Sequence, residues 1–296
     1  MSNINDLSEL NWAQSCDDML LDIGISASIR SRLRQLAIKA MYIPLVFSQA
    51  VKHQNTPHLR IIFYHSIFEH ERFKFSEQLK FFRDNYTVMP LGDALIKAKN
   101  NQITEPTLSI TFDDGYLNNF TVAADILADQ DLTACFYVTS GFIDIEPTNL
   151  SDIRNFCKSR FLIRKPIQNM TWDNIRTLRQ SGHEIGSHGI SHRSLTAISE
   201  ADMVAEIQTS KTIIEGHLKE PVRHFSIPFG THTHYSPDIL NAISQTGYES
   251  CVLGIRGAMR PALNPYKLRR DHCSANWSIG EIRSHLMRSF LWPKQI

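Results

Sequence analysis

Two adjacent carboxylates follow an apolar run of the sequence. Residues 108–112 predict a β-strand, and Asp113 and Asp114 come directly after it, ahead of Gly115. Neighbouring side chains leave an extended chain in different directions, so one carboxylate could bind a metal ion while the other stays free as a base. Asp and Gly also favour ordinary turns and helix caps. The motif alone therefore leaves a structural and a catalytic interpretation open.

Two histidines form a second group. His188 and His192 are four residues apart, which puts both imidazoles on one face of a helix or helical turn, where they could reach one ion. The chain has 13 histidines, so this spacing also fits two solvent-exposed side chains. Residues 182–186 predict a short strand that follows a helix, and this context favours the metal-binding interpretation.

The elements that must position these groups alternate between strands and helices from Leu59 onward. Such alternation predicts parallel strands covered by helices, and over some 200 residues it suits a barrel. The carboxyl ends of parallel barrel strands form the face on which active sites lie. The predicted strands are 59–64, 108–112, 134–138, 184–186, 225–227 and 250–253, and the predicted helices are 75–85, 122–128, 172–181, 201–217 and 237–247.

The chain divides into two predicted parts. Residues 1–56 are expected to form a helical N-terminal extension, with Ser26 as the cap of an amphipathic helix, and residues 57–296 the α/β barrel domain. The helix is expected to pack on the barrel, and the alternative is weak contact with a membrane surface or a partner. Residues 144–169 show no clear periodicity and are predicted to be a long loop near the site.

Composition excludes several classes of function. The net charge is +1 and no run of Lys or Arg occurs, which argues against nucleic-acid binding. The five cysteines are scattered and form no Cys-x-x-Cys pair, so neither a disulfide framework nor a thiolate zinc site is expected. The first residues lack the basic-then-apolar pattern of a secretory signal. These features predict a cytoplasmic protein, and nothing in the sequence indicates its oligomeric state.

In their order and spacing, these groups resemble the polysaccharide deacetylase family, also called carbohydrate esterase family 4. The resemblance covers about Leu59 to Arg270. It implies a distorted, incomplete (β/α) barrel with about seven parallel strands. It also implies a metal-dependent hydrolase that removes N-acetyl groups from amino sugars of a polysaccharide or glycan precursor. The segments that carry it besides the two groups above are 61–65 (Ile-Ile-Phe-Tyr-His), 171–172 (Thr-Trp), 182–188, 225–230 (Phe-Ser-Ile-Pro-Phe-Gly) and 268–270.

The resemblance also implies roles for individual residues. Asp114, His188 and His192 would bind one divalent ion, commonly zinc, with cobalt or nickel as other candidates. Asp113 matches the family's general base. Two imidazoles and one carboxylate, with positions left open, are what a hydrolytic metal site requires.

Three further residues are implied to contact the substrate. The backbone amide of Tyr116 would help to hold the oxyanion of the tetrahedral intermediate. Pro228 and Phe229 would face a sugar ring from one wall of the groove. The width of this groove depends on loops, so the sequence does not indicate which sugar or chain length is accepted.

The sequence departs from the family pattern at two places. The Leu-x-His motif that supplies a general acid in many members has no match near the C-terminus, so His65 on the first strand is the nominated acid, with His272 in reserve. Ser226 stands where the family often has an arginine. Orientation of Asp113 would then depend on Arg269, on Arg270 or on no equivalent residue.

Two other functions remain open at this stage. The same metal chemistry would serve an O-acetyl esterase or a deformylase acting on a lipid-linked sugar, because all three reactions attack a carbonyl carbon. A non-catalytic glycan-binding relative is the other alternative. The expected cytoplasmic location favours a glycan intermediate on a lipid carrier or a nucleotide as substrate.

Overall fold

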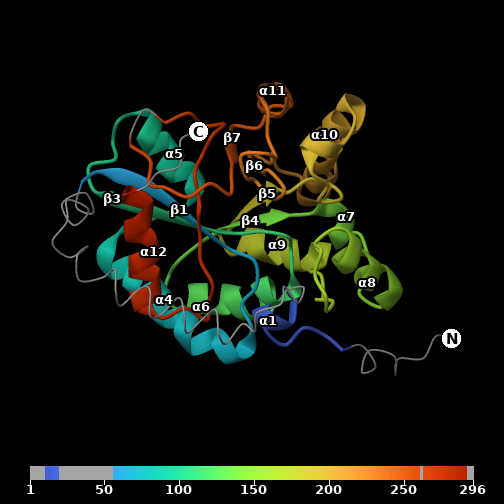
Figure 1. Cartoon of the computed structure of the whole chain (residues 1–296), viewed down its shortest axis with the longest axis horizontal. Coiled ribbons are helices and arrows are strands. Elements are labelled where there is room, and N and C mark those ends of the chain that lie inside the picture. The colour runs from blue at the N-terminus through green and yellow to red at the C-terminus, as the bar shows by residue number, and fades with distance from the viewer. Residues whose placement is uncertain (1–10, 20–55, 261–262, 292–296) are drawn as a thin grey trace.

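The computed structural model describes residues 11–19, 56–260 and 263–291 of the 296-residue chain. Its strands form one sheet that curls into a half-barrel of seven parallel strands, in the order β7-β6-β5-β4-β3-β1-β8, with β2 paired to β3 off this path (Figure 1). The predicted distorted, incomplete barrel is confirmed. The strands are β1 (His58–Tyr64), β2 (Thr87–Val88), β3 (Pro106–Phe112), β4 (Cys135–Val138), β5 (Glu184–Ser187), β6 (His224–Ser226), β7 (Ser250–Val252) and β8 (Asp271–His272).

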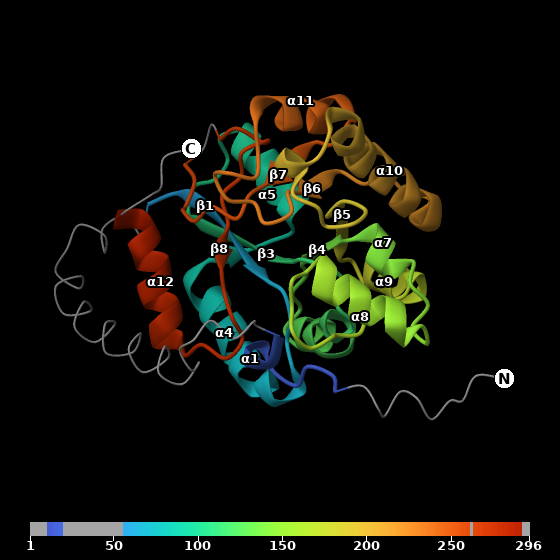
Figure 2. The same ribbon diagram turned by 45° about the vertical axis from the view of Figure 1, so that its right-hand side comes forward.

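Helices cover the outside of the sheet, and three of those described begin at Ser or Thr caps. The Thr171, Ser199 and Ser236 side chains each accept a hydrogen bond from a backbone amide in the first turn of the helix that follows. The arrangement around the barrel can be followed in Figure 2. The helices are α1 (Cys16–Met19), α4 (Arg72–Asn85), α5 (Leu91–Lys99), α6 (Ala124–Ala128), α7 (Ser140–Ile143), α8 (Leu150–Ser159), α9 (Trp172–Gln180), α10 (Glu200–Leu218), α11 (Pro237–Gln245) and α12 (Ile279–Leu291), with short 3-10 turns at Glu69–Glu71 (η2) and Leu195–Ala197 (η4) and a π-helical turn at Asn119–Ala123 (η3).

The central strands are buried on both faces, as expected for a parallel sheet between a core and a layer of helices. All seven residues of β1 are buried. On one side of the sheet the rings of Phe112 and Phe136 stack at 4.9 Å. The six predicted strands are present close to their expected bounds.

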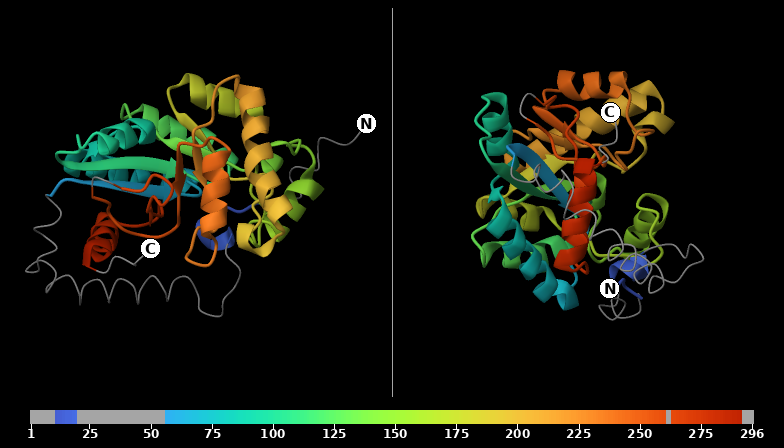
Figure 3. Two further views of the ribbon diagram at one scale, coloured as in Figure 1. Left: turned by 90° about the horizontal axis from the view of Figure 1, so that it is seen from above. Right: turned by 60° about the vertical axis from the view of Figure 1, so that its left-hand side comes forward.

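The gap between β7 and β1 is closed by an irregular segment that contains β8. At its start, Leu268 bonds to β7, because its amide donates to the carbonyl of Cys251 at 3.0 Å. At its end, the amide of Cys273 donates to the carbonyl of Phe63 on β1 at 2.9 Å. The segment therefore crosses the open side of the barrel and carries Arg270 into its interior. Figure 3 shows α12, which follows this segment, lying against α4.

One predicted loop contains a helix. Residues 144–169 include α8, of which only Ile153 and Cys157 are buried. Two buried residues four apart give a weak periodic signal, which explains why the sequence analysis missed the helix. The cap is nevertheless present in the sequence, since the Asn149 side chain accepts a hydrogen bond from the Asp152 amide. Helix α5 and the two-residue strands β2 and β8 were not predicted either.

Part of the predicted N-terminal extension packs on the barrel domain. The Ala13 amide donates to the Pro166 carbonyl at 2.9 Å, and the Arg164 amide donates to the Met19 carbonyl at 2.8 Å. The predicted helix after Ser26 lies outside the described residues, and the boundary at residue 56 stays a prediction. Within the described ranges, no helix combines the length and the apolar character needed to cross a membrane.

Candidate active site

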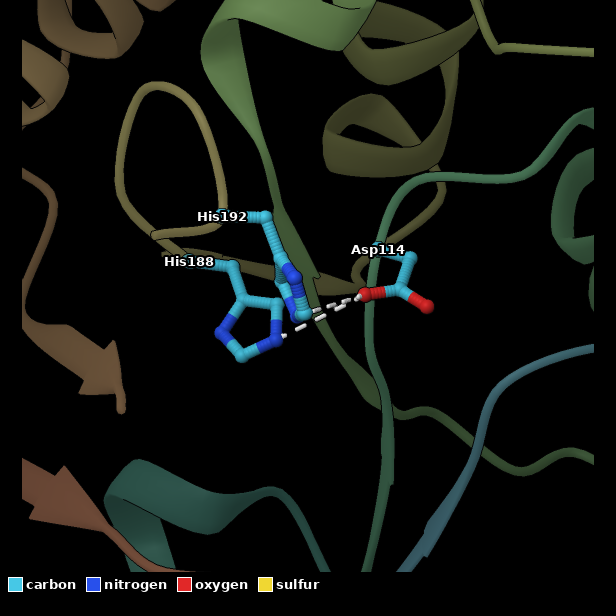
Figure 4. A group of neighbouring side chains, drawn as sticks. All are labelled: Asp114, His188 and His192. Atoms are coloured by element: carbon cyan, nitrogen blue, oxygen red, sulfur yellow. Dashed lines mark ion pairs between the residues drawn. The ribbon is translucent and has the colours of Figure 1, made fainter. Parts of the chain in front are cut away.

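Three side chains from two loops converge at the carboxyl ends of the strands. Asp114 follows β3, and His188 and His192 follow β5 (Figure 4). The Oδ1 atom of Asp114 lies 3.6 Å from His188 Nε2 and 3.5 Å from His192 Nε2. One ligand atom from each residue lies within 4.8 Å of the others, and all three residues are buried. The structure thus brings together the three residues that the sequence nominated as metal ligands.

The histidine loop is not helical, and the helical interpretation of its spacing was wrong. Gly189 and His192 both have positive φ, at +80° and +52°, so the chain turns sharply instead of continuing in a helix. Glu206 of α10 fastens this turn, because its carboxylate accepts from the amides of Ile190 and Ser191 at 2.8 and 3.0 Å. Sequence analysis missed Glu206, which is 14 residues beyond the second histidine and belongs to another element.

Backbone carbonyls orient both imidazoles. Nδ1 of His188 donates to the carbonyl of Ser226 at 2.8 Å, and Nδ1 of His192 donates to the carbonyl of Arg160 at 3.2 Å. Because a carbonyl only accepts, each ring carries its proton on Nδ1 and presents a free Nε2 lone pair towards Asp114. Burial lowers the pKa of His192 to about 4, so this ring is neutral at pH 7.

These donor atoms fit a divalent cation. Within the described part of the chain, the buried Oδ1 atom of Asp114 has no hydrogen-bond partner, which is costly for a carboxylate oxygen. Two ligands on a tetrahedral zinc ion lie roughly 3.4 Å apart, from metal–ligand distances of about 2.0–2.1 Å. The two measured Nε2–Oδ1 distances are close to that spacing. Two imidazole nitrogens and one carboxylate oxygen are therefore arranged as in a zinc site.

The neighbouring carboxylate, Asp113, is held by an arginine instead. Its two oxygens accept from Nη1 and Nη2 of Arg270 at 2.7 Å each, and both residues are buried. Burial alone raises the pKa of the Asp113 carboxyl, but the Arg270 guanidinium holds the pKa at about 2. Asp113 is therefore ionised at neutral pH, and its Oδ2 atom lies 4.0 Å from His188 Nε2.

The guanidinium of Arg270 makes several further hydrogen bonds. Besides the two bonds to Asp113, its guanidinium donates to Ser226 Oγ at 2.8 Å, and to Thr111 Oγ1 and the Leu253 carbonyl at 3.2 Å each. The group also lies over the ring of Phe63, 4.4 Å from its centroid. Of the two arginines considered for orienting Asp113, it is therefore Arg270 that contacts the carboxylate. The Ser226 hydroxyl accepts a hydrogen bond from this arginine.

Arg269 points elsewhere. Its Nη1 atom donates to the carbonyl of Arg256 at 3.1 Å, and the residue is only partly buried. Successive side chains of an extended segment alternate in direction, so only one of the two arginines can face the barrel interior.

The two candidate general acids lie side by side. The rings of His65, just after β1, and His272, on β8, are 5.6 Å apart, and each packs against Phe63. His65 is half-buried and is close enough to Asp113 to lower the pKa of that carboxyl, whereas His272 is exposed. The geometry keeps both residues near the site.

The residues predicted to contact the substrate differ in their exposure. The Tyr116 ring is buried. The antiparallel bridge to Asn169 uses the Leu117 amide and the Gly115 carbonyl, so the Tyr116 amide takes no part in its two hydrogen bonds. Pro228 is buried, so its ring is not part of the open surface. Phe229 is 38% exposed, and its ring lies 4.7 Å from that of His192. Of the two predicted sugar-facing residues, only Phe229 is available to a ligand.

Known proteins resemble this chain in sequence and in fold. The family model for polysaccharide deacetylases matches residues 100–251, just over half of the chain. YxkH of Bacillus subtilis (strain 168), whose name places it among polysaccharide deacetylases, is 25% identical over 238 residues, which are 77% of this chain and 76% of that protein. A chitin deacetylase of Colletotrichum lindemuthianum is 25% identical over 171 residues, 57% of this chain and 51% of its own.

Solved structures share the fold. The Streptococcus pyogenes deacetylase PplD, in complex with acetate, superposes with a TM-score of 0.64 at 20% identity, over 78% of this chain and 99% of its own. IcaB from Ammonifex degensii superposes with a TM-score of 0.61 at 17% identity, over 74% and 92% of the two chains. At these identities the likeness concerns the fold.

The Asp113–Arg270 pair yields a test of stability. Replacing Arg270 by Met leaves a buried carboxylate without its cation, so the free energy of unfolding should fall by about 3–5 kcal/mol in urea denaturation. The Arg269→Met variant is the matched control, because it removes a cation that makes a single hydrogen bond to a carbonyl. Its free energy of unfolding should fall by about 1 kcal/mol. Equal losses in the two variants would contradict the assigned pairing.

Proposed function

The chain belongs to the polysaccharide deacetylase family, and from this premise we propose that it is a metal-dependent hydrolase that removes N-acetyl groups from amino sugars of a polysaccharide or of a glycan precursor. One observation carries the proposal. An ionised carboxylate held by Arg270 lies directly beside three side chains arranged for a divalent ion. A binding protein has no need for a buried base next to a metal site.

The metal site would consist of Asp114, His188 and His192. Their nitrogen and oxygen donors suit zinc, and cobalt or nickel are the other candidates because imidazole–carboxylate sites accept several ions. An ion held there would supply a Lewis acid that polarises the amide carbonyl and makes water acidic enough to lose a proton near neutral pH.

The residues around this site would carry the proton transfers. Asp113 would accept the proton of the attacking water, while Arg270 keeps the carboxylate in place. The Tyr116 amide would donate a hydrogen bond to the substrate's carbonyl oxygen as negative charge develops there. His65, or His272 beside it, would give a proton to the departing amine. Acetate and a free amino sugar are the products.

Phe229 would bind the sugar. Its ring is exposed beside His192, so a sugar whose apolar face packs on this ring would have its acetamido group close to the metal ligands. The five cysteines are all free, which is compatible with the expected cytoplasmic location, and a substrate met in that compartment remains part of the proposal.

The alternatives differ in substrate and not in site. An O-acetyl ester or a formamide on a lipid-linked sugar presents the same type of carbonyl to the same residues. A non-catalytic glycan-binding role is less well supported, because neither the base nor any of the three metal-binding side chains is missing.

Acetate release from N-acetylglucosamine oligomers tests the proposed function. Activity should disappear after chelation and return when zinc, cobalt or nickel is restored, because without an ion nothing polarises the amide carbonyl. The protein should bind about one ion per chain, and circular dichroism should show that the metal-free protein stays folded. Release that persists in metal-free protein would contradict metal dependence. Release only from O-acetylated or N-formylated sugars would move the function to the alternatives.

The two candidate acids can be separated by substitution. His65→Gln should lower kcat for N-acetylated oligomers by about 10²–10⁴, the usual contribution of a general acid, whereas His272→Gln should cost less than about tenfold. The readout that isolates the role is 4-nitrophenyl acetate, whose leaving group needs no proton, so His65→Gln should hydrolyse it nearly as fast as the unchanged protein. The opposite pattern would make His272 the acid, and small effects in both variants would contradict the assignment to this pair.

A further inference from the structure

A pocket with several basic side chains lies outside the candidate active site. It is formed between the N-terminal segment, α8 and the loop that follows α8, and its empty volume, counting the space at its mouth, is about 550 Å³. Figure 3 shows the N-terminal segment with α1 next to α8. The lining residues are Asn11, Arg154, Arg164, Lys165 and Pro166.

The charge at this pocket is unusual for the chain. Residues 154–165 contain five Lys or Arg residues and no Asp or Glu, although the whole chain has a net charge of only +1. Of the three lining cations, Lys165 pairs with Asp18 at 3.0 Å. Arg154 and Arg164 have no ion-pair partner among the residues that the structure describes. Among the described residues, the three lining cations and the carboxylate of Asp18 sum to a charge of +2.

The basic segment is firmly anchored. Its apolar side chains Ile153, Cys157 and Phe161 are buried in a cluster that also contains the Tyr116 ring. Two backbone hydrogen bonds attach the N-terminal segment to the loop after α8: the Ala13 amide donates to the Pro166 carbonyl at 2.9 Å, and the Arg164 amide donates to the Met19 carbonyl at 2.8 Å. The outward-facing cations are therefore presented by an ordered scaffold, which limits the entropy lost when a ligand binds.

The same segment is connected to the metal-binding loops. Beyond Pro166, the Gln168 carbonyl accepts from the Leu117 amide at 2.7 Å, and the Met170 amide donates to the Gly115 carbonyl at 3.0 Å, so the chain runs beside the residues that follow Asp114. At its other end, the Arg160 carbonyl accepts from His192. The segment that lines the pocket thus also contacts the loops that carry Asp114 and His192.

We propose that this pocket binds a phosphate group of a phosphorylated glycan substrate while an N-acetylated sugar of the same molecule occupies the metal site. The inference rests on the proposed function for the identity of the glycan. Arg154 and Arg164 offer planar guanidinium groups, which bind phosphate oxygens in pairs, and a phosphate monoester carries about −1.5 to −2 charges at pH 7, close to the local +2. A concave pocket suits one discrete phosphate better than the plane of a bilayer.

Calorimetric titration with inorganic phosphate and pyrophosphate tests the binding site in the full-length protein. The Arg154→Gln/Arg164→Gln double variant should bind pyrophosphate at least tenfold more weakly than the unchanged protein. The control is Lys80→Gln/Arg83→Gln, which removes two exposed cations of α4 and should change the affinity by less than twofold. Unchanged affinity in the pocket variant, or equal losses in both variants, would overturn the proposal.

Kinetics test the connection to the active site. We expect kcat/KM for an N-acetylglucosamine oligomer bearing a terminal phosphate to exceed that for the neutral oligomer at least tenfold. The pocket variant should lose this preference and keep the neutral rate within twofold. Equal rates for both oligomers in the unchanged protein would overturn the link to the substrate.

Vesicle binding tells whether the pocket recognises a phosphate of a soluble glycan or of a lipid bilayer. The pyrophosphate titration tells whether this proposal stands when the proposed function fails. Adsorption to phosphatidylglycerol vesicles that needs the two arginines, without binding of soluble pyrophosphate, would overturn the substrate pocket in favour of a bilayer contact. Pyrophosphate binding that depends on both arginines would support the pocket even if neither oligomer released acetate, and the failure would then belong to the deacetylase assignment.

Discussion

The ion pair between Asp113 and Arg270 is the constraint on which the candidate site depends. A carboxylate buried at the end of β3 is stable only with a cation and hydrogen bonds around it, and all of these come from the segment that closes the barrel or from residues facing it. The segment that closes the barrel therefore also orients the proposed base, because it carries Arg270. This explains why no arginine is needed at position 226: Ser226 leaves room for the guanidinium of Arg270 and accepts a hydrogen bond from it.

The three candidate metal ligands are positioned differently from Asp113. Asp113 has its charge neutralised by protein groups, whereas Asp114, the next residue, points a buried oxygen at two imidazole nitrogens that carry no proton. Both imidazoles are turned by carbonyls from distant segments, one at Ser226 on β6 and one at Arg160 after α8. Two adjacent carboxylates thus have different partners: Asp113 faces the fixed cation of Arg270, and Asp114 faces two imidazole nitrogens that could bind an ion together with it.

Much of this could be predicted from the sequence, because the strands and the metal-binding motifs are local. The buried strand before Asp113 and the His-x-x-x-His spacing each lie within a few residues, and the order of the motifs identified the fold. Contacts between distant segments could not be predicted in the same way. Arg269 and Arg270 are equivalent as sequence, and only the register of the closing segment decides which faces inward. Glu206 and the Arg160 carbonyl were missed for the same reason, and α8 because its buried face is two residues wide.

The central claim is that Asp113 is the base of a metal-dependent deacetylase, and the most direct measurement compares acetate release by the unchanged protein and by Asp113→Asn at equal bound metal. Asn has nearly the same size as Asp but accepts a proton far less readily. The account expects about one ion per chain in both proteins and a rate about 10²–10⁴ lower in the variant, the usual contribution of a general base. An Asp113→Asn protein that binds its ion and releases acetate at the original rate would contradict it.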